Sequence, residues 1–296
     1  MRGGRGSPGG SMTYTYQPEL RKISPEEAIR TLQARYPGRI QIGPVNCDDG
    51  INLVEVRLRA LGVEVAPLRV DPARYRDYLA QAEYAARYPG YYAGNFPEKS
   101  FEHFLVGELG AMGMGRVFID IASEHSPLCE IAARLHGCTS YSQDIMYPAG
   151  IHGRQIGSDA SNLPVADQAF DTAAVTCSIE HFEGNADVLF LREMQRTLRP
   201  GGKVIIVPLY LFQRASAQTD PLYAVTETVT FDEGAEICCA PGWGNRHGRF
   251  YSPDTLHARL IAPNPKMSFR VLRLQNPAEV DASIYCRFVL EGTRLA

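Results

Sequence analysis

Five polar side chains in the middle of the chain could together bind a ligand and move a proton. Asp120, Asp144 and Asp159 each close a short strand-like run, and Glu180 and His181 follow a fourth run. Carboxylates accept hydrogen bonds from hydroxyl and amino groups, and histidine exchanges a proton near neutral pH. If the runs are neighbouring strands, these residues form one site at the strand ends.

The segment from Val117 to Pro208 predicts the strands that position these side chains. Strand-like runs alternate with helical stretches at 127–136 and 185–198, which is typical of parallel strands joined by crossover helices. In an open sheet of this type, ligands bind at the carboxyl ends of the strands. We therefore predict an α/β fold with a doubly wound, mostly parallel sheet and helices on both faces.

The first third of the chain is predicted to hold a leader and an N-terminal elaboration. Residues 1–12, rich in Gly and Arg, contain few apolar side chains and are interpreted as a disordered leader or tag. Residues 13–110 predict a small α+β elaboration with cap helices, because Ser24-Pro25 and Asp71-Pro72 are typical helix starts. The stretch 52–61 fits either a strand or a helix.

Residues 111–296 are predicted to form the main domain, with a long insertion at 209–249. A connection of this length is usually a lid, a binding loop or a mobile segment. It carries Trp243, the only tryptophan, and His247, which could close over a substrate or simply anchor a surface loop. The elements expected after it are a helix from Ser252 and strands at 268–274 and 283–290.

Taken together, these features resemble the class I S-adenosylmethionine-dependent methyltransferases, well over roughly 117–207 and loosely over the last two strands. Similar enzymes have an acid at the end of the first and second strands, an Asp after the third, and Pro-Gly-Gly before the fifth. The matching residues here are Asp120, Asp144, Asp159 and Pro200-Gly201-Gly202. The resemblance implies a Rossmann-like sheet of the seven-stranded type, with S-adenosyl-L-methionine as cofactor and S-adenosyl-L-homocysteine as product.

The resemblance also implies how the cofactor is held. Asp144 would accept both hydrogens of the ribose diol, Asp159 would accept the adenine amino hydrogen, and Ala160 would donate its backbone N–H to a ring nitrogen. Asp120 and Ser178, at the ends of the first and fourth strands, would complete the contact. The alternative for Asp144 is a helix N-cap or loop acid, and an Asx turn at Asp159 is compatible with cofactor binding.

The loop after the first strand departs from the family pattern, because residues 120–127 contain no glycine. In similar enzymes, bare glycine backbone lets the methionine part of the cofactor lie close to this loop. Ala122 and Ser123 are small enough to approximate that approach. We therefore predict a retained pocket with an altered loop geometry, in which Glu124 and His125 are solvated.

Two histidines are candidate catalytic residues. His181 stands where similar enzymes face the methyl group of the cofactor, so it could be a general base, or Glu180-His181 could be packing polarity only. His103 could line the acceptor pocket, or it could be a buried, hydrogen-bonded residue. Because the methyl sulfonium is already activated, the protein need only align the acceptor and accept or tolerate a proton.

Composition and charge argue against several other classes of function. A net charge of -3 without a basic block argues against a nucleic-acid partner. No apolar run approaches the roughly 20 residues that span a bilayer, and no secretory signal opens the chain, so we expect a cytoplasmic protein without a membrane partner. The seven cysteines, Cys47 among them, include no Cys-x-x-Cys pair and are interpreted as reduced thiols without disulfides. The histidines and acids show no metal-ligand spacing, so no metal is expected.

The sequence therefore predicts an enzyme that transfers a methyl group to a small-molecule acceptor. The preferred reaction is O-methylation of a sugar-like or secondary-metabolite hydroxyl. The alternative is a non-catalytic regulatory protein that binds S-adenosylmethionine or a nucleotide and whose glycine loop has decayed. A dinucleotide oxidoreductase fits poorly, because Gly-x-Gly-x-x-Gly is missing after the first strand. A homo-oligomer is compatible with the sequence.

Overall fold

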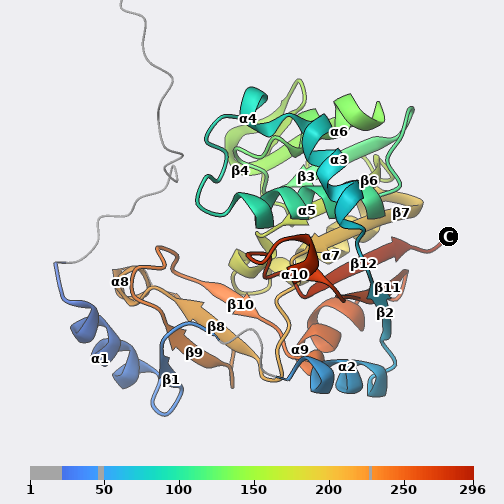
Figure 1. Ribbon diagram of the computed structural model, residues 1–296. Coiled ribbons are helices and arrows are strands. Elements are labelled where there is room, and N and C mark those ends of the chain that lie inside the picture. Colours follow the sequence, from blue (N-terminus) through green and yellow to red (C-terminus); the bar gives the residue numbers. More distant parts are fainter. Residues whose placement is uncertain (1–21, 46–49, 227–228) are drawn as a thin grey trace, which may run out of the picture.

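The larger of two sheets carries the predicted strand ends. The computed structural model describes residues 22–45, 50–226 and 229–296, so the predicted leader at 1–12 and Cys47 lie outside the described residues. Within these ranges one sheet has the strand order β2-β11-β12-β7-β6-β3-β4-β5 (Figure 1). Its strands are β2 (Glu64–Leu68), β3 (Val117–Ile121), β4 (Thr139–His152), β5 (Gln155–Gly157), β6 (Phe170–Thr176), β7 (Leu198–Val207), β11 (Met267–Leu274) and β12 (Phe288–Arg294).

This sheet is mostly parallel. β12 runs antiparallel to β7 and β11, whereas β2, β3, β4, β6 and β7 make parallel pairs with their other neighbours. β4 pairs with β5 in two places. Residues 142–144 pair with it first, and residues 149–152 then turn back and pair with the same short strand. The predicted mostly parallel α/β sheet is confirmed, and β2 extends it at one edge beyond the seven-stranded type.

Helices cover both faces of the sheet. Successive side chains of each buried strand point to opposite sides, so apolar residues on both faces need to be covered. On one face, Phe118 of β3 packs with α3 (Pro72–Ala82), α5 (Phe96–Leu109) and α6 (Leu128–His136). On the other face, Ile119 packs with α2 (Ile51–Ala60), α7 (Ala186–Thr197) and α9 (Pro253–Leu256). The shorter helices are α4 (Tyr84–Arg87), α10 (Pro277–Val280), the 3₁₀ turn η1 (Ile179–His181) and the π-helical turn η2 (His257–Ile261). In the ranges described, every helix is too short or too polar to cross a bilayer.

A second sheet lies below the first in Figure 1 and joins segments far apart in the chain. Its strand order is β1-β9-β8-β10, with β1 and β8 both parallel to β9 and β10 antiparallel to β8. One strand comes from the predicted N-terminal elaboration and three from the predicted insertion. α1 (Pro25–Arg35) and α8 (Pro221–Thr226) pack on it through Leu32, Val225 and Ile237. The strands are β1 (Ile40–Ile42), β8 (Ser216–Thr219), β9 (Glu236–Cys239) and β10 (Gly248–Phe250).

The structure settles one open assignment and corrects one strand boundary, for local reasons. The ambiguous stretch 52–61 is helical, because Val54 and Leu58 stand one helical turn apart and are both buried. The final strand begins at Phe288 instead of Ser283. Ahead of it, the buried carboxylate of Glu98 accepts the backbone N–H groups of Tyr285 and Cys286, which are therefore not free to pair with a strand.

Candidate functional site

The ends of β3, β4 and β6 lie side by side, so the first-strand loop, Asp144 and Ser178 are brought together. Asp120 pairs in register with Ser142 on one side and with Ala174 on the other. Asp144 Oδ2 accepts a hydrogen bond from the backbone N–H of Glu124 at 2.9 Å. Ser178 Oγ lies 3.4 Å from the carbonyl oxygen of Ala122. The loop after β3 thus contacts the two neighbouring strand ends.

Asp159 and Ala160 follow β5, the edge strand next to β4. Asp159 is exposed, and its Oδ1 accepts hydrogen bonds from the backbone N–H and the hydroxyl of Ser161 at 2.8 and 2.7 Å. This is the Asx-type turn expected for such a residue. Both bonds involve Oδ1, so the turn leaves acceptor capacity on Oδ2 of the carboxylate.

The loop after β3 adopts a backbone that usually needs glycine. Ala122 has φ 52° and Glu124 has φ 24°, both in the left-handed region. Gln143 supports the loop: its side-chain oxygen accepts from Ala122 N at 3.2 Å, and its carbonyl accepts from Ser123 N at 2.9 Å. Tyr147 closes the other side, because its hydroxyl donates to the carbonyl of Glu124 at 2.5 Å. Hydrogen bonds from β4 therefore hold residues other than glycine in a glycine-like path.

Asp120 lies beneath this loop and is fully buried. Neither of its carboxylate oxygens makes a hydrogen bond of good geometry among the described residues, although the side chain of Ser126 lies close enough to favour the charged form. Burial raises the pKa of Asp120 to about 7, and the nearby charge of Asp144 acts in the same direction. A buried polar group without a partner is costly, so it is expected where a structure is prepared for a ligand.

His181 ends the η1 turn after β6, and its hydrogen bonds assign its tautomer. Nδ1 lies 2.6 Å from the carbonyl oxygen of His247, which can only accept, so Nδ1 carries a proton. Nε2 then has a lone pair in the neutral ring and lies 3.8 Å from Oε1 of Glu180. The ring of Trp243 packs beside the imidazole, with centroids 5.8 Å apart. Nε2 can therefore receive a proton next to a carboxylate.

His103 occupies a different environment. It is buried, with Nδ1 2.7 Å from the hydroxyl of Tyr84 and Nε2 3.1 Å from the hydroxyl of Tyr91. Burial lowers its pKa to about 3, so the ring is neutral. Nε2 also lies 3.4 Å from Oγ of Ser126, which follows the cofactor-side loop. The structure thus places His103 behind that loop.

A cavity of about 270 Å³ lies between the two sheets, beside η1. Glu180 lines it, together with Gln218 of β8 and Arg287 before β12. Six aromatic side chains line it: Tyr210, Phe212, Trp243, Phe250, Tyr285 and Phe288. The sequence singled out only Trp243 among these six. The others could not be found from local patterns, because they come together only when β8, β10 and β12 are in place.

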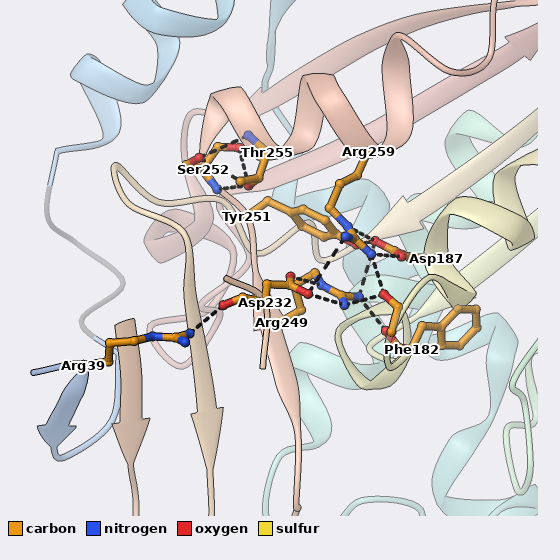
Figure 2. A network of polar contacts seen from close by, with 10 residues as sticks. Arg39, Phe182, Asp187, Asp232, Arg249, Tyr251, Ser252, Thr255 and Arg259 are labelled. Carbon is orange, nitrogen blue, oxygen red and sulfur yellow. Dashed lines mark hydrogen bonds and ion pairs between the residues drawn. The ribbon is translucent and has the colours of Figure 1, made fainter. Parts of the chain in front are cut away.

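An ion network next to the cavity fixes the segment that follows His181 (Figure 2). Arg249, which follows His247 on β10, donates to the carbonyl oxygens of Phe182 and Gly184 at 2.5 and 2.8 Å. Its guanidinium also pairs with Asp232 at 2.6 Å and with Asp187 of α7 at 3.4 Å. Arg249 therefore ties both β10 and the end of η1 to α7.

A second buried pair lies behind the fourth strand, on α5. Nζ of Lys99 is 3.0 Å from Oε1 of Glu102, and both side chains are buried. Burial raises the pKa of Glu102 to about 8, although the charge of Lys99 opposes that shift. Sequence reasoning missed this pair, because a lysine and a glutamate three residues apart usually form an exposed helix pair.

The comparisons with known proteins agree with the sequence resemblance. Residues 123–206 match the family model described as a methyltransferase domain. No curated protein matches the chain. A similar solved structure is a protein assigned to methyl transfer in an antibiotic biosynthesis pathway of Anabaena variabilis, with 21% identity and a TM-score of 0.31. That match covers 38% of this chain and 46% of the Anabaena chain, so this chain spans about half the length of that relative.

Two further solved structures match over more of their length. The first is a Haloferax volcanii complex of a Trm112 methyltransferase activator with a methyltransferase. The match has 11% sequence identity and a TM-score of 0.46, and it covers 75% of this chain and 98% of that chain. The second is Burkholderia thailandensis 1,6-didemethyltoxoflavin-N1-methyltransferase with bound S-adenosylhomocysteine: 16% identity, 78% of this chain, 93% of that chain and a TM-score of 0.40. Residues 123–206 are thus similar to a methyltransferase domain, and they lie within a mostly parallel α/β sheet of the class I type. S-adenosylmethionine is the cofactor that this match supports.

Proposed function

We propose that the protein methylates an oxygen of a small-molecule acceptor, a sugar-like or secondary-metabolite hydroxyl. The observation that carries this proposal is the hydrogen bonding of the two ring nitrogens of His181. Its Nδ1–H is committed to the carbonyl of His247, and its Nε2 is open to a proton beside Glu180. A hydroxyl needs a base when it is alkylated, because the oxygen must lose its proton.

The residues at the ends of β3, β4 and β5 suit the cofactor. Asp144 accepts two backbone N–H groups, from Glu124 and Met146, and a carboxylate has lone pairs left for the ribose hydroxyls. Asp159 and Ala160 would hold the adenine. The left-handed backbone at Ala122 supports a close approach of the cofactor to the loop, as glycine would. When bound, the cofactor supplies an activated methyl group on a sulfonium.

Ser123, Asp120 and Ser178 complete the proposed cofactor contacts. Ser123 lies in the loop, and the unpartnered oxygens of Asp120 lie beneath it. Ser178 follows the fourth strand and reaches the carbonyl of Ala122. These groups suit the amino and carboxylate ends of an amino acid, because they offer both hydroxyl donors and an acceptor.

In the proposed reaction, His181 accepts the proton of the acceptor hydroxyl at Nε2. The resulting imidazolium keeps its Nδ1–H bond to the carbonyl of His247, and the carboxylate of Glu180 stabilises its charge. Both ring nitrogens of His103 already face tyrosine hydroxyls. We therefore give His103 a supporting role behind the loop, through Ser126, and no proton transfer.

The alternative function, a regulatory protein with a decayed glycine loop, loses its main support. The loop lacks glycine, yet Ala122 and Glu124 keep the left-handed conformation at a cost of about 1 kcal/mol or more per residue. Such strain persists only where the surrounding structure enforces it, as Gln143 does here. A conformation maintained in this way supports a working cofactor loop.

Replacement of His181 tests the reaction. Transfer of labelled methyl from S-adenosylmethionine is first measured on a panel of hydroxylated small molecules, and the best acceptor is then used for variants. His181→Ala should lower turnover by roughly 10² to 10⁴ and leave the affinity for S-adenosylhomocysteine unchanged. His152→Ala, at an exposed histidine of β4, is the matched control and should retain full turnover. Full turnover in His181→Ala would remove this residue from the mechanism.

A further inference from the structure

Glu180 has one carboxylate oxygen for which the described residues provide no partner. The side chain lines the cavity between the two sheets, and the residue is 3% exposed. Oε1 lies near Nε2 of His181, but Oε2 is buried without any hydrogen bond. A buried carboxylate oxygen left without a donor is unfavourable, so we expect a ligand to supply the donor.

The other polar groups on the cavity wall differ from Glu180, because they already have partners. Oε1 of Gln218 accepts from the backbone N–H of Val45 at 2.9 Å. Arg287 donates to the carbonyl of Ile284 at 3.1 Å. The hydroxyl of Tyr285 accepts from Nδ2 of Asn95 at 3.1 Å. A ligand in the cavity therefore meets one strong hydrogen-bond acceptor without a donor, Oε2 of Glu180. Few other polar groups on the wall lack a partner.

The remaining wall is apolar, with six aromatic side chains beside aliphatic and proline residues. The ring of Tyr210 lies 4.9 Å from that of Phe250, and Phe250 lies 5.5 Å from Phe212. Tyr285 stacks on Tyr210 at 6.4 Å with an interplanar angle of 16°. Flat apolar surfaces of this kind favour flat aromatic ligands, because offset-stacked and edge-to-face contacts add to the burial of apolar area.

We propose that the methyl acceptor is a flat aromatic molecule without negative charge, which donates an O–H or N–H hydrogen bond to Oε2 of Glu180. This inference rests on the proposed function, because it takes the cavity beside His181 as the acceptor site. A sugar would bring several hydroxyl groups into an aromatic wall that satisfies few of them. A carboxylated ring would bring a second negative charge close to the carboxylate of Glu180, which has an unpartnered oxygen, whereas the guanidinium of Arg287 on the same wall already donates to a backbone carbonyl.

The only tryptophan of the chain, Trp243, lies on the cavity wall and can report its occupancy. Incorporation of 5-fluorotryptophan gives one ¹⁹F resonance, which is titrated with 2-naphthol, 2-naphthoate and methyl α-glucoside. We expect 2-naphthol to shift the resonance and 2-naphthoate to bind at least about tenfold more weakly. Methyl α-glucoside should give no shift over the same range. Equal binding of 2-naphthoate, tighter binding of the glucoside, or no shift with 2-naphthol would overturn the proposal.

Glu180→Gln separates the carboxylate charge from the shape of the cavity. In this variant, 2-naphthoate should bind within about threefold of 2-naphthol, because the repulsive charge is gone. Glu64→Gln, the same change at an exposed position of β2, should keep the wild-type ratio. An unchanged ratio in Glu180→Gln would also overturn the proposal.

Calorimetry with S-adenosylhomocysteine on the same samples distinguishes this proposal from the proposed function. If S-adenosylhomocysteine binds but the naphthyl probes do not show the expected order of affinity, the proposal of an aromatic acceptor is wrong and the proposal of methyl transfer still stands. If calorimetry detects no heat of S-adenosylhomocysteine binding to the wild-type protein, the proposal of methyl transfer is wrong. The interpretation of the cavity as an acceptor site is then wrong as well.

Discussion

Asp120 and Asp187 are two fully buried carboxyl groups that the protein treats in opposite ways. Asp187, on α7, accepts from the hydroxyl of Tyr251 at 2.8 Å and pairs with Arg259 at 2.6 Å and Arg249 at 3.4 Å. Asp120, at the end of β3, pairs with no cation among the described residues, and burial raises its pKa to about 7. Two arginines pair with Asp187, whereas burial without a cation favours the protonated form of Asp120.

The contrast between these acids separates two regions of the molecule. Around Asp187, ion pairs join α7 to β10 and fix the turn that carries His181 (Figure 2). Around Asp120, a strained loop and unsatisfied oxygens face the proposed cofactor site. Ion pairs therefore fix the turn that carries His181 before any ligand binds, whereas the carboxylate beneath the first-strand loop is left for a ligand to satisfy.

Removal of Asp187 should have the largest effect on stability. Asp187→Ala leaves the buried guanidinium of Arg249 with less compensation, and breaking such a buried network costs about 3 to 5 kcal/mol. Urea denaturation measures this loss in the free energy of unfolding. Tyr251→Phe, which removes one neutral donor to the same carboxylate, is the control and should cost about 1 kcal/mol. A loss in Asp187→Ala no greater than in Tyr251→Phe would refute the assigned role of the network.

Asp120 should make folding less favourable as the pH rises. Its raised pKa means that folding favours the protonated acid, a contribution complete below the ordinary value of about 3.9 and lost as pH approaches the folded value. The folded pKa is about 7. Asp120→Asn cannot ionise, so relative to wild type it should gain about 3 kcal/mol in unfolding free energy between pH 5 and pH 8. Parallel pH–stability curves for the two proteins, from urea denaturation, would contradict this account.

Asp144 should contribute a smaller amount, and to the free energy of ligand binding. Asp144→Ala removes a charged acceptor proposed for the ribose and should weaken S-adenosylhomocysteine binding by about 1 to 3 kcal/mol in titration calorimetry. Asp167→Ala, at an exposed acid of the same half of the sheet, removes equal charge and should leave the affinity unchanged. If both variants bind alike, Asp144 acts only within the protein, through Glu124 and Met146.

The proximity of Asp120 and Asp144 could be predicted from the sequence because its signals are local. Each acid lies near the end of the parallel pairing of its own strand, so strand assignment alone brings the two together. The left-handed backbone of Ala122 could not be foreseen in a residue other than glycine. It depends on Gln143, which lies 21 residues further along the chain.

The acceptor side could not be predicted because it depends on distant pairings. β1 and β9 form parallel neighbours although they are separated by most of the chain, and neither segment shows the partner of the other. His181 was singled out by position, but its proton state depends on the carbonyl of His247, 66 residues away. The cavity walls likewise combine Tyr210 and Tyr285, which no sequence period relates.

The most direct test of the central claim is calorimetry of S-adenosylhomocysteine with changes at Ala122. The wild-type protein should bind at one site. Ala122→Gly should retain binding and gain up to about 1 kcal/mol of stability, because glycine adopts positive φ without strain. Ala122→Phe, if its melting transition shows that it is folded, should lose binding, since its side chain would occupy the approach to the loop. Undiminished binding in folded Ala122→Phe would place the cofactor elsewhere and contradict the account.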